Sequence, residues 1–161
     1  MKDFVEADLT AAYRMLSECR TAIVATKGAE EGLYNLTPYG WFMPMDYEPV
    51  TKVIISSDPA HQAAINIKRT GTFALCIPSD DQAQWVTDCG SVSAPDADKF
   101  ALFKIPAVKA CKTDLCIPAP LLSGWIECRL IKALREGSVL LIMGEAVGAY
   151  ADARLAALLN A

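Results

Sequence analysis

Short apolar runs alternate with turn residues along most of this chain, and the pattern predicts a mainly β domain. Strands are expected where β-branched or apolar runs are bounded by Gly, Pro, Asp or Ser. We predict strands at 22–26, 33–37, 51–56, 72–77, 121–133 and 139–147, with a hairpin turn at 27–32. About six short strands with helices at the margins indicate a small barrel with peripheral helices.

Helical patterns lie around these strands. Apolar residues recur at helical spacing over 7–19, and Pro59 is expected to begin a second helix that ends near Gly71. Weaker helical patterns cover 80–87, 99–103 and 151–161, while 88–98 and 104–120 are predicted to be irregular. No repeat, low-complexity tract or linker divides the sequence, so we expect one domain over 1–161.

The composition favours a globular protein with an apolar interface. A chain of 161 residues can bury a sizeable core without disulfides. The hydrophobic fraction of 53% and the mean hydropathy of +0.24 are high for a soluble monomer. No run approaches the roughly 18 apolar residues of a membrane helix, so we expect no membrane partner. We attribute the apolar excess to a subunit interface rather than to a larger core.

The charge balance argues against polyanionic partners. The net charge is −4 and the pI is about 5.0, and no basic stripe occurs, which disfavours nucleic acid and anionic membranes. Residues 1–6 lack the charged and then apolar layout of a signal peptide. We therefore expect a cytoplasmic protein.

The cysteines and the single histidine limit the available chemistry. None of the six cysteines forms a C-x-x-C pair, and His61 lies far from them in sequence, so no metal site is predicted. Free thiols in a reducing compartment are expected, with Cys76 in a core strand and Cys89 more exposed in a loop. One histidine must serve any nucleophilic triad, and phosphate-binding glycine motifs are missing, which favours chemistry supplied by a bound cofactor.

Residues 35–42 combine polar and aromatic side chains that suit a planar ring. Asn35 and Thr37 should point to the same side of a strand, where they either bond the edge of a ring or form a polar strand end. The aromatic residues that follow either stack on a ring or pack in a core or interface. They are Tyr39, Trp41 and Phe42. Gly40 would let a ligand or backbone approach closely.

A second polar group lies where a strand passes through a loop into a helix. Ser56, Ser57, His61 and Gln62 would bind a phosphate or ribityl chain with help from the helix dipole, or they would only cap the helix. Asp58 would repel a phosphate, so we expect it to cap.

Three further polar residues have the same two interpretations, which are a contact with a ligand and an ordinary structural or solvent-exposed role. Asn66 and Arg69 share the helix that Pro59 begins, and Arg69 would add positive charge or lie in solvent. Lys99 would reach an anionic phosphate or be an ordinary solvated lysine.

An ordered set of motifs resembles the flavin reductase-like, FMN-binding split-barrel family, and most closely its flavoredoxins. The set covers roughly residues 16–150 and keeps the family's order. It comprises N-x-T-P-Y-G-W-F, S-S-D-P-A-H-Q, N-I-x-x-T-G-x-F, C-G-S, D-K-F, P-x-x-x-x-x-x-I-E-C and I-M-G-E-A-V.

The resemblance implies a homodimer of Greek-key split β-barrels with FMN at the dimer interface. Electrons would pass from NAD(P)H or a redox protein to flavin or another acceptor. No residue is assigned a catalytic role. The residues implied in FMN binding are Asn35, Thr37, Pro38, Tyr39, Gly40, Trp41, Phe42, Ser56, Ser57, His61, Gln62, Asn66 and Lys99.

The sequence departs from the family pattern at two places. Family members commonly carry Gly-Asp-His before the last strand, whereas this chain has Glu136-Gly137-Ser138. Serine carries no charge, so phosphate binding or tuning of the flavin is expected to weaken. The family usually continues beyond the point that corresponds to Ala161, so we expect either a more open flavin pocket or an altered acceptor specificity here. Two alternatives to a redox enzyme follow: an FMN-binding or sensor protein without turnover, and a flavin-free dimer.

Overall fold

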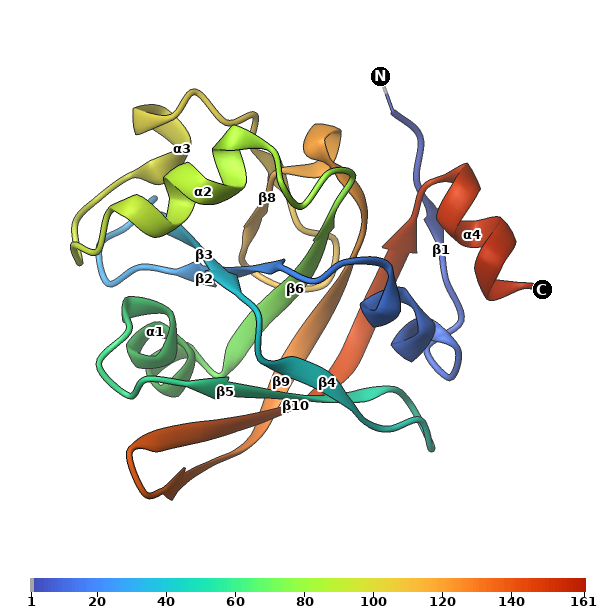
Figure 1. The fold of residues 1–161 in the computed structure, drawn as a ribbon, viewed down its shortest axis with the longest axis horizontal. Helices are drawn as coiled ribbons and strands as arrows, with labels where there is room; N and C mark the ends of the chain where they lie inside the picture. Colours follow the sequence, from blue (N-terminus) through green and yellow to red (C-terminus); the bar gives the residue numbers. More distant parts are fainter. Residues whose placement is uncertain (1) are drawn as a thin grey trace.

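A strongly curved antiparallel sheet forms the body of the protein (Figure 1). The structure, a computed structural model, describes residues 2–161. Its strands are β1 (Val5–Glu6), β2 (Ala22–Lys27), β3 (Tyr34–Tyr39), β4 (Phe42–Asp46), β5 (Lys52–Ser57), β6 (Thr72–Pro78), β7 (Val108–Lys109), β8 (Cys116–Ile117), β9 (Leu122–Glu136) and β10 (Val139–Ala151). Its helices are η1 (Ala12–Glu18), α1 (Gln62–Thr70), α2 (Gln84–Ser91), α3 (Lys99–Leu102), η2 (Ala119–Leu121) and α4 (Ala153–Leu159).

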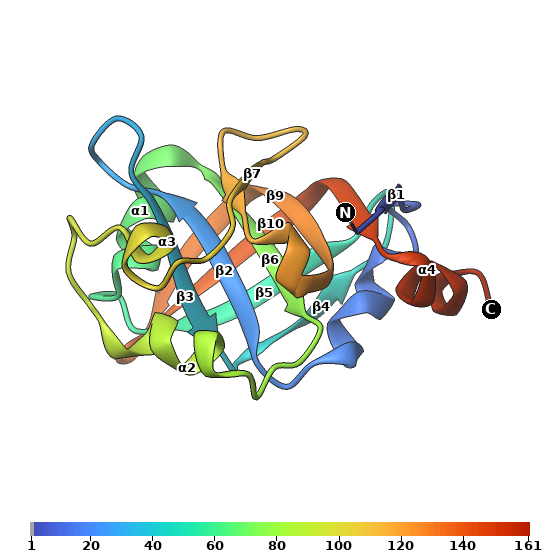
Figure 2. The same ribbon diagram turned by 90° about the horizontal axis from the view of Figure 1, so that it is seen from above.

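The strand order is β3-β2-β6-β9-β10-β5-β4, and β1 pairs with β10. Viewed from above, the sheet curls so that β3 and β4, consecutive in sequence, are its two outer strands (Figure 2). The chain passes between them at Gly40 and Trp41. The sheet does not close between β3 and β4. The link there carries Gly40 and Trp41, which belong to the segment predicted to contact a planar ring.

Two groups of apolar residues fill the two sides of the sheet. The cluster inside the curve includes Met15, Phe73 and Ile142, all fully buried. The second cluster lies beneath α2, α3 and the β7–β8 hairpin, and it includes Trp125, which stacks on Tyr150 at 4.9 Å between ring centroids. Burial of apolar surface on both faces holds the sheet and the covering helices in fixed positions.

Most predicted elements are confirmed, with shifted ends. The α1 helix ends at Gly71, whose φ of 75° is the left-handed conformation that closes many helices. The last two strands are longer than expected and form the hairpin that projects at the lower left of Figure 1.

Several predictions were wrong. The main sheet has eight strands rather than the six expected, since β1 and β4 were missed, and two short strands, β7 and β8, form a separate two-stranded sheet in the region predicted to be irregular. The helix expected over 7–19 is limited to η1, because the Asp8 carboxylate accepts the Thr10 N–H and fixes a turn there. The α2 helix continues to Ser91, so Cys89 is a buried helical residue rather than an exposed loop residue.

Among residues 2–161, none of the helices has both the length and the apolar character needed to cross a membrane.

Candidate functional site

A cavity opens beside the link between β3 and β4. It has a volume of about 550 Å³. We call it the main cavity. Its walls are Pro38, Tyr39, Gly40, Trp41, Ser56, Ser57, Asp58, His61, Ser138 and Val139. Three elements that are distant in sequence meet here: the β3–β4 link, the end of β5 with the turn before α1, and the β9–β10 turn.

A smaller cavity of about 190 Å³ adjoins the main cavity, because Pro38 and His61 line both. We call it the polar cavity. Its walls also include Asn35, Thr37, Gln62, Cys89, Gly90, Val92, Ser93, Ala94 and Lys99. The Asn35 amide donates to the Thr37 hydroxyl at 3.2 Å, so the two side chains share one face of β3 as predicted. Several hydrogen-bonding groups therefore converge on one small space.

Lys99 is buried in the wall of the polar cavity, with 4% of its surface exposed. Its Nζ donates to the carbonyl oxygens of Leu36 at 2.7 Å and Cys89 at 2.6 Å. An ammonium group has three N–H donors, so one remains for the cavity. Burial lowers the pKa of Lys99, because the charged form loses hydration.

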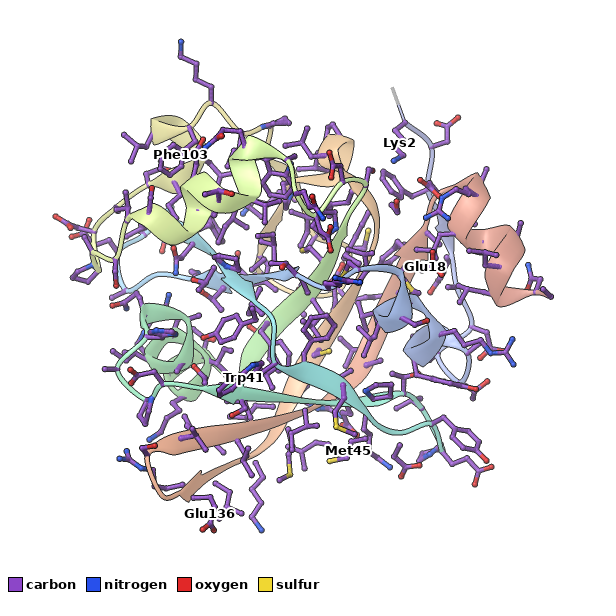
Figure 3. The ribbon with its side chains drawn as sticks, in the orientation of Figure 1. Lys2, Glu18, Trp41, Met45, Phe103 and Glu136 are labelled. Carbon is purple, nitrogen blue, oxygen red and sulfur yellow. The ribbon has the colours of Figure 1, made fainter. Side chains whose placement is uncertain are left out.

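An apolar groove of about 300 Å³ continues from the main cavity over the outer face of the sheet. Gly40, Trp41 and Ser56 line both spaces, and Phe42, Met43, Ile54 and Leu141 complete the groove. Trp41 is 72% exposed, which is unusual for an indole ring. Figure 3 labels Trp41, just before the start of β4, and Met45, near the end of that strand.

Close packing fixes the walls of the two cavities. A Cβ atom on Gly90 would lie 3.0 Å from Pro38 Cγ, so glycine lets α2 lie directly against β3. The hydroxyl groups of Tyr39 and Ser57 lie 2.8 Å apart and join β3 to β5. Burial raises the pKa of Tyr39, and the charge of Asp58 adds to this effect.

The N-terminus of α1 faces both cavities. His61 is its N-cap residue and makes no side-chain capping bond, while Asp58 instead accepts the Ala60 N–H at 2.8 Å in the preceding turn. The first-turn N–H groups therefore lack a capping side chain. An uncapped helix N-terminus favours negative charge nearby.

The structure brings together every residue implied in FMN binding except Asn66. That side chain is buried and lines neither cavity: its amide donates to Thr26 Oγ1 at 3.0 Å, and its oxygen accepts at 2.9 Å from Gln62, which lines the polar cavity. Phe42 lines only the apolar groove. The roles of all these residues as flavin contacts stay a prediction.

The sequence reasoning missed part of the polar cavity. The sequence predicts a plain loop around Ser93 and places Cys89 in that loop. Only the packing of α2 against β3 shows that this segment forms a wall. Ser138 was identified as a departure from the family, and it does line the main cavity.

Comparison with known proteins decides the family. The family model described as "Flavin reductase like domain" matches residues 18–161. The chain belongs to the flavin reductase-like family. An uncharacterized Escherichia coli (strain K12) protein, YddH, is 31% identical over 156 residues, which cover 96% of this chain and 82% of that protein.

Solved structures of this family have the same fold. An FMN-binding domain of a flavin reductases-like enzyme from Shewanella baltica OS155 superposes with a TM-score of 0.78 at 26% identity, over 94% of this chain and 78% of that one. Flavoredoxin of Desulfovibrio vulgaris (Miyazaki F) gives 0.72 at 20% identity, over 83% and 70%. The predicted fold class, a mainly β split barrel, is therefore confirmed.

The cavity walls of this flavin reductase-like protein suit a flavin. The main cavity, at about 550 Å³, lies within the range of small-molecule sites, and the polar cavity extends it. An exposed indole lies at one side, and amide, hydroxyl and ammonium donors lie at the other. Such a set matches a ligand with a flat apolar ring and one polar edge.

Proposed function

We propose that this protein is an FMN-dependent oxidoreductase of the flavoredoxin or flavin reductase type. It would pass electrons from NAD(P)H or a protein donor to free flavin or another acceptor. The observation that carries the proposal is the continuity of the main cavity, the polar cavity and the exposed face of Trp41. Bound FMN would supply the hydride and electron transfer, so the protein needs no acid–base residue for that step.

The walls suggest which end of the cofactor each cavity would hold. Asn35, Thr37 and Lys99 would hold the polar edge of the ring in the polar cavity, where their donors are already fixed by hydrogen bonds. Burial in this cavity would exclude water from that edge and strengthen the same hydrogen bonds. This arrangement gives Lys99 a contact with the ring rather than the phosphate contact expected from the sequence.

The opposite end of FMN would lie along the turn between β5 and α1. Ser56 and Ser57 offer hydroxyl groups, and the N-terminus of α1 offers backbone N–H groups. The role of these groups would be to bind the ribityl chain and the phosphate. Trp41 would cover one face of the ring.

We also propose a homodimer that forms through the outer face around Trp41. Paired registers place Met43 beside Ile54 and Met143 beside Ile54, and Trp41, Met43 and Met45 are all exposed. The apolar face is continuous with the groove and the main cavity. A second copy would cover the apolar surface and complete the FMN pocket.

The dimer proposal has a direct test. Met43→Glu places a charge on the outer face, so the mass from light scattering should fall toward that of a monomer. Leu102→Glu is the matched control, since Leu102 is also exposed, on α3, and lines neither cavity nor groove. An unchanged mass in the Met43 variant would contradict this interface.

The proposed function is tested by a visible spectrum of the protein with added FMN, before and after anaerobic NADH. We expect a protein-bound flavin band near ~450 nm that is lost on reduction. Binding without loss of the band, even with a protein donor, would favour a sensor that holds FMN without turnover. The uncharged Ser138 in the main cavity is the observation that favours this second candidate. Absence of flavin binding would contradict the proposal and leave a flavin-free dimer.

A further inference from the structure

The two cavities contain one group of each charge. Among the described residues that line them, Lys99 is the one lysine or arginine and Asp58 the one carboxylate. The ammonium lies in the polar cavity and the carboxylate in the main cavity. No arginine or second lysine in these walls is available to neutralise a phosphate dianion.

Asp58 lies at the turn where the phosphate of FMN would be placed. Its neighbours in the main cavity are the serines of β5, His61 and Ser138, which all offer hydrogen-bonding groups. Its side chain is exposed, and none of the ion pairs among residues 2–161 includes it. No ion pair among the described residues therefore neutralises its negative charge.

The charge of Asp58 acts on a residue in the wall of the main cavity. It contributes to the raised pKa of Tyr39, whose hydroxyl is bonded to Ser57. A phosphate bound beside Ser57 would meet the same field. The helix N-terminus favours an anion at this place, whereas Asp58 opposes it.

We propose that Asp58 is a specificity-determining residue, which makes the site select the flavin ring and discriminate little between FMN and uncharged riboflavin. The inference rests on the proposed function, because it assumes that the ring binds in these cavities. It predicts the class of flavin that the protein accepts: free flavins with or without a phosphate, rather than FMN alone.

The test is a titration of the full-length protein with riboflavin and with FMN, followed by quenching of flavin fluorescence. For the wild-type protein we expect dissociation constants that differ by less than about tenfold. Asp58→Asn should tighten FMN binding about threefold to tenfold, and should leave riboflavin binding within about twofold. The Asn side-chain oxygen can still accept the Ala60 N–H, so the turn should be preserved.

Asp80→Asn is a closely matched control. Asp80 accepts the N–H of Gln82 through its side chain and the N–H of Ala83 through its carbonyl, just as Asp58 accepts those of Ala60 and His61. It lies outside both cavities. This variant should leave the affinity for both flavins unchanged.

Two results would overturn the inference while leaving the proposed function in place. One is a wild-type preference for FMN over riboflavin above about tenfold, which would require cations from elsewhere, such as a second copy. The other is an Asp58→Asn variant that changes neither affinity or changes both equally. If neither flavin binds to the wild-type protein, the proposed function and the inference both fail.

Discussion

Glu127 and Lys99 are both buried and both able to carry charge, yet the fold surrounds them in opposite ways. The Glu127 carboxylate is fully buried and accepts hydrogen bonds from the backbone N–H groups of Cys111 and Lys112, the Thr113 hydroxyl and the Trp125 indole, at 2.8 to 3.1 Å. Lys99 instead donates to two carbonyl oxygens and borders a cavity.

The difference separates a structural charge from one that can serve a ligand. Glu127 has its lone pairs engaged by its own chain, so it ties the loop after β7 to the sheet. Lys99 retains one donor and belongs to none of the ion pairs within residues 2–161. A buried cation without an anionic partner is costly unless another group, such as a ligand, helps to solvate it.

The largest expected effect comes from removing the structural charge. Glu127→Ala leaves buried donors without an acceptor, so the free energy of unfolding should fall by about 3–5 kcal/mol. Urea denaturation measures this loss. Glu145→Ala is the control, because Glu145 pairs with an exposed arginine, Arg129, and should cost less than about 1 kcal/mol. Equal losses in the two variants would contradict the comparison.

Removal of Lys99, the charge that would serve the ligand, should affect the binding of FMN more than the folding of the protein. In the double variant Trp41→Ala and Lys99→Ala, we expect FMN affinity to fall at least about thirtyfold, because stacking and a buried hydrogen bond are both lost. Isothermal titration calorimetry measures the affinity, and denaturation measures stability. Leu102→Ala with Lys104→Ala is the matched double control outside the cavities. Near wild-type affinity in the first pair would contradict the site.

Asn66 sharpens the comparison, because it resembles Glu127 rather than Lys99: its buried side chain is hydrogen-bonded by groups of its own chain. Its side chain bonds Thr26 and Gln62 and reaches no cavity. Asn66→Ala should lower the free energy of unfolding by about 1–2 kcal/mol and change FMN affinity by less than about threefold. A large loss of affinity in a stable variant would instead restore Asn66 to the site.

The smallest expected effect is a loss of stability at alkaline pH that depends on Cys89, whose carbonyl oxygen accepts a hydrogen bond from Lys99. Burial raises the pKa of this thiol from 9.0 to about 11. The unfolded thiol ionises first, so stability should fall as pH rises from 9 toward 11. At pH 10 the loss should be smaller in Cys89→Ala than in the wild-type protein by about 1 kcal/mol. Urea denaturation at pH 8 and pH 10 measures both; equal losses would indicate that the thiol is not buried in solution.

Much of the fold could be predicted because the signals are local. The hairpin of β2 and β3 and the end of α1 at Gly71 follow from turn chemistry and from period-two or helical spacing. β4 was missed because Met43 and Met45 face outward, so its apolar pattern does not mark a core.

The candidate site was predictable in part for the same reason. Asn35 and Thr37 could be placed on one face from strand geometry alone, and Ser56 and Ser57 from the strand before a helix. The side chain of Asn66 could not be oriented, because helical spacing does not show which partner a buried amide will find. The depth of Lys99 depended on the packing of α2 against β3.

The sequence by itself determined the strands, the family resemblance and the residue types that suit a flavin, since these depend on local patterns and on motif order. Only the tertiary structure decided which side chains meet. The curl of the sheet brings the β3–β4 link, the turn before α1 and Ser138 to the main cavity, and packing places Asp58 in its wall and Lys99 in the wall of the polar cavity. Contacts between distant segments arise from packing, because only burial across the whole sheet fixes which faces lie together.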